Sequence, residues 1–151
     1  MEKMDARKRY TQMVIKQSFL KLLKKKPVNR ITVKEVCALA QLNRATFYAH
    51  YSDCFALMES IENELIDAFE ESLRYVNSFD VTALIEAIYD MVDQNQAACR
   101  VLILGNTSST VLMRMIALAK EDSIAYWRKE LPNASETELE MMYTHLSNGL
   151  M

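Results

Sequence analysis

The stretch that decides the fold is ITVKEVCALAQLNRATFYAHY, residues 31–51. Thr32 and Glu35 have the spacing of a capping box, in which each side chain accepts a hydrogen bond from the other residue's backbone amide, so a short helix should begin here. The apolar pattern then breaks, and Asn43 is a good N-cap for a second short helix over about residues 44–50. Two helices of about two turns each, separated by a turn of three or four residues, are the length pattern of a helix-turn-helix.

The flanking sequence is helical by pattern as well. Residues 5–26 carry apolar side chains at helical spacing among lysines and predict a long helix that Pro27 ends. Ser135 and Glu138 form a second capping box, which opens a last helix. The helices expected between these two, after caps at Ser52 or Asp53 and at Asp80, cover about residues 53–75, 81–92, 97–104 and 108–131.

The composition excludes most other architectures. The chain has 151 residues, 50% of them hydrophobic, but only 2 glycines and 2 prolines. A β-sandwich or barrel needs Gly, Asn-Gly or Pro turns about every ten residues, which this chain does not supply. No apolar run approaches the roughly 18 residues of a membrane span, and no apolar stretch follows the N-terminal charges as in a signal peptide. We therefore expect an all-α protein with no part in the membrane.

The net charge of −2 hides a division of the chain. Residues 1–51 hold 12 Lys and Arg against 3 Asp and Glu, a balance of +9. Residues 52–151 hold the other 6 basic and 17 acidic side chains, a balance of −11. Such asymmetry favours a polyanion-binding part joined to a second part, although two solvated faces of one bundle would give the same numbers.

The cysteines and histidines indicate no metal or catalytic site. Cys37, Cys54 and Cys99 lack CxxC spacing and predict neither a disulfide framework nor a metal site. They are typical of a reducing compartment, so we expect a cytoplasmic protein with buried thiols and no cofactor. The chain has only 2 histidines and no GxSxG, HExxH, Walker or GxGxxG pattern, so enzymatic activity is not expected.

The stretch 31–51 resembles the DNA-binding domain of the TetR family of bacterial transcriptional regulators. The resemblance rests on I-T-V-x-x-V, on the small residue Ala40 and on T-F-Y-x-H-Y with a helix after it. It extends to the long first helix and the start of the fourth, while the remaining residues match only in pattern. It implies a three-helix DNA-binding domain over residues 1–51 and a helical effector-binding and dimerisation domain over residues 52–151.

The resemblance also implies which residues touch DNA. Thr32 would contact a phosphate, and Arg44 can donate two hydrogen bonds to a guanine edge. Phe47 and Tyr51 are expected in the core, whereas Tyr48 is expected at the DNA although its ring could also be buried. The full predicted set is Arg30, Thr32, Lys34, Asn43, Arg44, Thr46, Tyr48 and His50.

Two positions depart from the family pattern. Gln41 stands where the turn usually has a glycine, and a left-handed backbone there would cost on the order of 1 kcal/mol. Cys54 stands where the fourth helix usually begins with a lysine, so one phosphate contact is expected to be missing. An inert thiol is the favoured interpretation of Cys54, and the alternative is an exposed, oxidisable thiol whose pKa a helix N-terminus lowers.

The acidic part is expected to bind an unidentified small-molecule effector, and the alternative is a family member without a ligand. The helix over 108–131 is apolar on most sides, which predicts that other helices bury it. Its methionines suit an adaptable pocket, although each apolar side chain could equally be plain core. The candidate pocket residues are Tyr89, Cys99, Met113 and Trp127.

The last helix is expected to form a homodimer interface, because the family dimerises through its last two helices. The pattern stops in mid-helix at residues 148–151, where the resemblance implies a further helix, so we expect the natural chain to be longer. The predicted dimerisation residues, which share one side of the helix, are Leu139, Met142, Tyr143, Leu146 and Leu150.

The leading functional prediction is therefore a dimeric regulator, most simply a repressor that an effector releases from a palindromic DNA operator. The alternative is a helical module whose basic part binds a protein or membrane surface without specific DNA binding.

Overall fold

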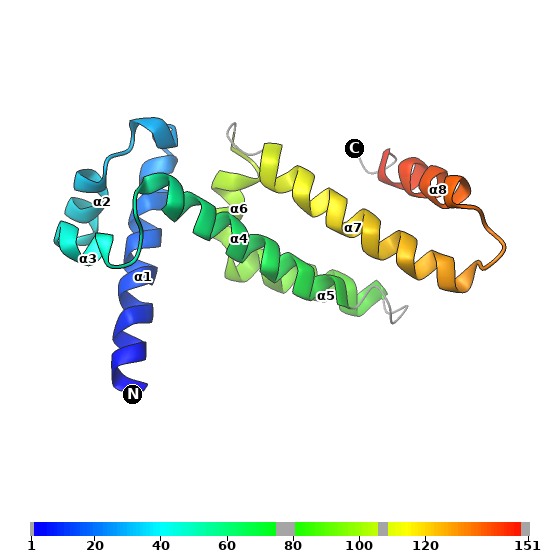
Figure 1. Cartoon of the computed structure of the whole chain (residues 1–151), viewed down its shortest axis with the longest axis horizontal. Helices are drawn as coiled ribbons and strands as arrows, with labels where there is room; N and C mark the ends of the chain where they lie inside the picture. The colour runs from blue at the N-terminus through cyan, green and yellow to red at the C-terminus, as the bar shows by residue number, and fades with distance from the viewer. Residues whose placement is uncertain (1, 75–80, 106–108, 149–151) are drawn as a thin grey trace. The chain divides into compact units, whose positions relative to one another are not determined.

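The computed structural model of the chain describes residues 2–74, 81–105 and 109–148, and most of these residues lie in helices (Figure 1). No strand occurs in these ranges, so the prediction of an all-α fold is confirmed. The elements in chain order are α1 (Glu2–Leu23), the 3-10 turn η1 (Val28–Arg30), α2 (Val33–Ala40), α3 (Arg44–Tyr48), α4 (Cys54–Leu73), α5 (Val81–Gln94), α6 (Gln96–Leu102), α7 (Ser109–Glu130) and α8 (Glu136–Asn148).

The chain forms two compact units, and each combines segments that are distant in sequence. Unit 1 comprises residues 1–65 and 95–109, and unit 2 comprises residues 66–94 and 110–151. The predicted division into a DNA-binding domain over residues 1–51 and an effector-binding and dimerisation domain over residues 52–151 is a division by function, and it stays a prediction.

Unit 1 is built around α1, which packs against α2 and α6, while α2 packs against α3. Fully buried side chains from four helices form its core, among them Phe19 of α1, Val36 of α2, Phe47 of α3 and Leu57 of α4. Removing such apolar surface from water is the main stabilising contribution, because α2 and α3 are too short to be stable alone. The predicted core positions of Phe47 and Tyr51 are confirmed, since both side chains are buried.

The helix boundaries differ slightly from the predicted ones. α1 ends at Leu23, three residues before the predicted end, and Lys24 and Lys25 lie in the turn that leads to Pro27. α4 begins at Cys54 because Asp53, not Ser52, caps it: the Asp53 carboxylate accepts from the amide of Ala56 at 2.8 Å. The predicted cap Asp80 and the predicted helix end at residue 75 lie outside the described residues.

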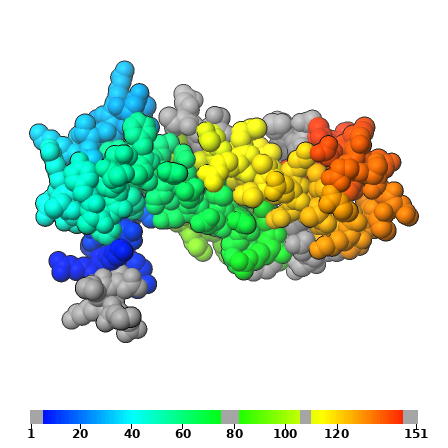
Figure 2. All heavy atoms as spheres, in the orientation of Figure 1, coloured from blue at the N-terminus to red at the C-terminus, as the bar shows by residue number. Residues whose placement is uncertain are grey.

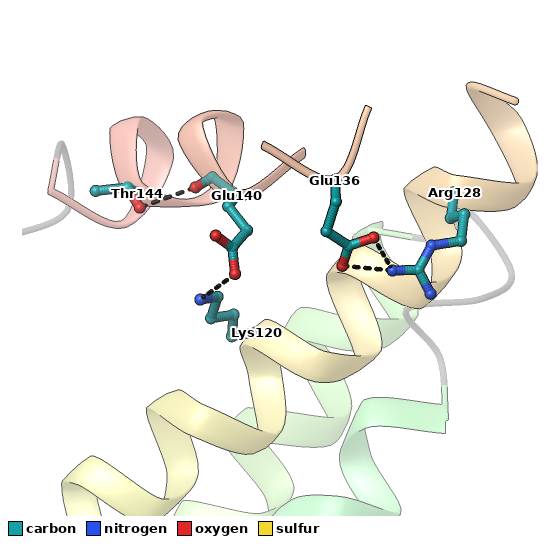
Figure 3. A network of polar contacts seen from close by, with 5 residues as sticks. All are labelled: Lys120, Arg128, Glu136, Glu140 and Thr144. Atoms are coloured by element: carbon teal, nitrogen blue, oxygen red, sulfur yellow. Dashed lines mark hydrogen bonds and ion pairs between the residues drawn. The ribbon is translucent and has the colours of Figure 1, made fainter. Parts of the chain in front are cut away.

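In unit 2, α7 and α8 form an antiparallel hairpin (Figure 1). Two ion pairs tie the helices together, Lys120–Glu140 with N–O at 3.3 Å and Arg128–Glu136, and both are drawn in Figure 3. The second capping box is confirmed, because the Ser135 amide donates to Glu138 at 2.8 Å and the Glu138 amide donates to the Ser135 hydroxyl at 3.3 Å.

The expectation that other helices bury α7 on all sides is wrong for the chain by itself. One side of α7 is buried, including Val111 and Met115, but Leu112, Met113 and Ile116 are exposed. The pattern showed correctly that the helix is apolar around most of its circumference, yet unit 2 supplies packing partners for only part of it. The exposed part is available to another surface.

Candidate nucleic-acid interface

The turn between α2 and α3 is tight and left-handed. Gln41 has φ 55° and ψ 41°, which is the left-handed conformation considered for this position in the sequence analysis. The turn is closed by the amide of Leu42, which donates to the carbonyl of Cys37 at 3.0 Å. A non-glycine residue in this region costs on the order of 1 kcal/mol, which the packing of α2 and α3 must offset.

The start of α2 is fixed by the predicted capping box. The Glu35 amide donates to the Thr32 hydroxyl at 3.3 Å, and the Thr32 amide donates to the Glu35 carboxylate at 2.9 Å. The Thr32 hydroxyl itself donates to the same carboxylate at 2.8 Å. A phosphate that approached this hydroxyl as an acceptor would therefore compete with Glu35.

Sequence reasoning missed the role of Lys26 beside this cap. The Lys26 ammonium lies 2.5 Å from the Glu35 carboxylate. That bond, helped by the hydrogen bonds from Thr32, lowers the pKa of Glu35 from 4.5 to about 2. The run of three lysines at residues 24–26 was visible, but a pairing across nine residues depends on how the turn folds back.

Two side chains hold the short helix α3 in place, one as its N-terminal cap and one in the core. The Asn43 side-chain oxygen accepts from the Thr46 amide at 2.7 Å and from the Thr46 hydroxyl at 3.0 Å, which confirms Asn43 as the N-cap. Phe47 anchors the inner side, and its ring lies edge-on to that of Tyr48, with centroids 5.7 Å apart. Tyr48 is 54% exposed, so the alternative of a buried Tyr48 is excluded.

The predicted DNA-binding residues all belong to unit 1 and lie at the surface of α2, α3 and the segments beside them. Figure 2 shows α2 and α3, in light blue and cyan, at the surface of the molecule in this view. Thr46 and His50 are half-buried, and the exposed members of the set are Arg30, Thr32, Lys34, Asn43, Arg44 and Tyr48.

This arrangement can hold an extended polyanion. Arg44 begins α3, and Lys34 lies in the first turn of α2, so each helix carries near its N-terminal end one cation, with five and three N–H donors respectively. Arginine can bind a planar acceptor pair with two parallel hydrogen bonds, whereas lysine acts as a point charge. The exposed Tyr48 hydroxyl adds a neutral donor at the other end of α3.

The thiols near this surface are not exposed. Cys37 and Cys54 are both buried, and burial raises the pKa of each thiol above its ordinary value. The alternative of an exposed, oxidisable Cys54 with a lowered pKa is therefore wrong: the side chain points into the core, where desolvation outweighs the effect of the helix N-terminus.

The predicted effector residues do not share one environment. Tyr89 and Met113 are exposed, Cys99 is buried in unit 1, and Trp127 is half-buried with its ring 6.4 Å from that of Tyr143. A groove of about 1320 Å³ in unit 2 is lined by other residues of the α7–α8 hairpin, including Met141, Met142 and His145. An effector site stays a prediction.

The predicted dimerisation residues divide in the same way. Leu139 is fully buried within its own chain, so it offers no surface to a second copy. Met142 is 39% exposed, while Tyr143 is half-buried and its hydroxyl donates to the carbonyl of Ile116 at 3.1 Å. The side chain of Leu146 and all of Leu150 lie outside the described residues.

No family model matches the chain. The chain is similar to an uncharacterized HTH-type transcriptional regulator, YxbF, of Bacillus subtilis (strain 168), with 29% identity over 59 residues. The match covers 39% of this chain and 16% of the relative, so it concerns a small part of that protein. Within the part of the chain that the structure describes, none of the helices is long and apolar enough to cross a membrane.

Proposed function

We propose that the chain is a DNA-binding transcriptional regulator that reads duplex DNA with α3. The observation that carries the proposal is the α2–α3 helix-turn-helix, in which Phe47 holds the inner side of α3 while Arg44 and Tyr48 are exposed. The second helix of such a motif is the one that enters a major groove. The similarity to an HTH-type transcriptional regulator supports the same class.

The geometry refines the roles within the motif. Arg44 is the candidate for base recognition at guanine, and Tyr48 is the candidate for a phosphate contact that fixes the register. Because the Thr46 hydroxyl donates to Asn43, its methyl group is the part left for a thymine. Because the Thr32 hydroxyl donates to Glu35, Lys34 is a stronger phosphate ligand than Thr32.

At a finer level, we propose a cytoplasmic TetR-like repressor that binds a palindromic operator as a homodimer and has no catalytic activity. The resemblance of residues 31–51 and the exposed apolar side of α7 support this level. A dimer would place two α3 helices roughly 34–36 Å apart, or more for widely separated half-sites. An effector could release the operator only if it bound one spacing of the two helices better than the other.

The test is selection of genomic fragments at moderate salt, followed by affinity measurements on the recovered site. Recovery of a palindromic site supports the proposal. Arg44→Ala should weaken binding and relax base preference at one position in each half-site, by about 1–3 kcal/mol. Tyr48→Ala should weaken binding to all sequences. Lys129→Ala, which removes an exposed cation of α7, is the control and should leave affinity unchanged.

Failure to recover any palindromic site, together with unchanged affinity in the Arg44→Ala and Tyr48→Ala variants, would contradict the proposal. That result would favour the alternative in which the basic part of the chain binds a protein or membrane surface.

A further inference from the structure

A shallow groove of about 720 Å³ lies in unit 1 between the end of α1 and the solvent side of α2. None of its lining residues belongs to the set proposed to bind DNA. Its residues are Lys21, Leu22, Lys24, Lys25, Glu35, Ala38 and Leu39.

The rim of this groove carries an excess of positive charge. Lys21, Lys24 and Lys25 are exposed, and the ion pairs found among the described residues of the chain do not include them. The carboxylate that lines the groove, Glu35, is already paired with Lys26 and hydrogen-bonded to Thr32. An acidic ligand would therefore meet three cations and a carboxylate whose charge is already compensated.

The floor of the groove is apolar. Leu39, in the last turn of α2, is 46% exposed. The exposed Ala38 and the half-buried Leu22 line the same groove. A nucleic-acid backbone would gain nothing from a leucine at this position. A ligand that carries both carboxylates and apolar side chains would gain on both counts, since burying an exposed leucine removes apolar surface from water.

We propose that this groove binds an acidic, amphipathic peptide segment of a partner protein. Apolar side chains of the segment lie on Leu22, Ala38 and Leu39, and its carboxylates pair with the lysines of the rim. Helices with one apolar side that lie in a groove are a common mode of peptide recognition. The partner would then be held beside the DNA-reading surface without using the residues that contact DNA.

The probe for the test is a fluorescein-labelled synthetic peptide, EDLLEDLLEDLLEDL, titrated with the full chain and followed by fluorescence anisotropy. A second peptide, EDSSEDSSEDSSEDS, has the same charge and no leucines. The leucine peptide should bind about tenfold more tightly than the serine peptide, because charge alone does not use the floor.

The decisive variant is Leu39→Lys, which adds a positive charge while removing the apolar floor. It should weaken binding of the leucine peptide about tenfold, whereas binding driven by charge alone would strengthen. Met13→Lys is the matched control, because Met13 is 44% exposed on α1 and lies outside the groove; it should leave peptide binding unchanged. Lys24→Glu should also weaken binding of the leucine peptide, because it replaces a cation of the rim with a carboxylate.

Three outcomes would overturn the proposal: equal binding of the two peptides, unchanged peptide binding by Leu39→Lys, or a Lys24→Glu variant that loses affinity for duplex DNA but not for the peptide. The last would identify the groove as a phosphate-binding surface. The proposal does not rest on operator recognition, so peptide binding without a recovered operator would separate the two.

Discussion

Gln41 is the residue where sequence and backbone conformation conflict. It occupies a left-handed conformation, with φ 55°, that an L-residue with a Cβ atom adopts at a cost. The structure retains it because the turn lies between two helices that both bury core side chains, Val36 and Phe47. Local strain of this size is tolerated where tertiary packing over-determines the backbone.

Replacing Gln41 with glycine should therefore stabilise unit 1. Glycine relieves a left-handed strain on the order of 1 kcal/mol but adds freedom to the unfolded chain, so we expect a net gain of at most about 0.5 kcal/mol in the free energy of unfolding. Hydrogen exchange of the α2 and α3 amides measures this change in the free energy of unfolding. Gln41→Ala is the control and should give no gain, because alanine keeps the Cβ atom; equal gains in both variants would show that the strain is not the cause.

Glu35 makes the stability of unit 1 depend on acid. Its pKa is about 2 in the folded chain, mainly because Lys26 bonds the ionised carboxylate. A pKa that is lower in the folded state than in the unfolded state contributes stability above the unfolded value of 4.5, and this stability is lost as the pH falls towards 2. The unfolding midpoint of the wild-type chain should thus exceed that of Glu35→Gln above pH 4.5.

This difference in midpoint should shrink between pH 4.5 and pH 2, as thermal unfolding at a series of pH values would show. Lys26→Met should shift the loss to higher pH, because it removes the largest cause of the lowered pKa. A wild-type advantage that persisted undiminished at pH 2 would mean that the capping geometry, not the ionised carboxylate, accounts for it.

At the scale of elements, α3 depends most on a single cap. It has five residues, Arg44–Tyr48, and the side chain of Asn43 satisfies both the amide and the hydroxyl of Thr46. Asn43→Ala should cost about 1 kcal/mol, while Asn43→Ser should restore most of it because serine is an equally good cap. Operator affinity should follow the same order if α3 reads DNA.

The matched comparison of operator affinity and α3 hydrogen exchange in these two variants separates two roles of Asn43. Loss of affinity in Asn43→Ser without loss of protection in α3 would assign Asn43 a direct DNA contact.

The sequence was informative wherever a local rule governs the structure. Both capping boxes, the cap at Asn43 and the buried positions of Phe47 and Tyr51 followed from spacing within one or two turns. Features that depend on distant residues did not follow. The Lys26–Glu35 pair arises where separate elements meet, and the exposure of Met113 depends on which side of α7 unit 2 covers. The burial of all three cysteines was expected and is confirmed.

At the scale of the whole molecule, the charge division predicts the salt dependence of binding. The balance of +9 in residues 1–51 lies in the part that carries the candidate interface. If Lys34 contacts one phosphate, Lys34→Ala should make the negative slope of log affinity against log salt shallower by about 0.9. Glu86→Gln in the acidic part should leave the slope unchanged; a slope that changed equally in both variants would indicate only a long-range effect of net charge.

The exposed apolar side chains of unit 2 are the surface through which the proposed homodimer would form. Leu112, Met113 and Ile116 on α7 and Met142 on α8 are exposed, and an interface between copies would remove them from water. Met113→Glu should therefore shift the chain towards monomer in analytical ultracentrifugation and weaken operator binding most at low protein concentration. Glu121→Gln on α7 is the control, because it leaves this apolar surface intact. If Met113→Glu left both the oligomeric state and the concentration dependence of operator binding unchanged, an interface on this side of α7 would be contradicted, since an unpaired charge buried in an interface is strongly destabilising.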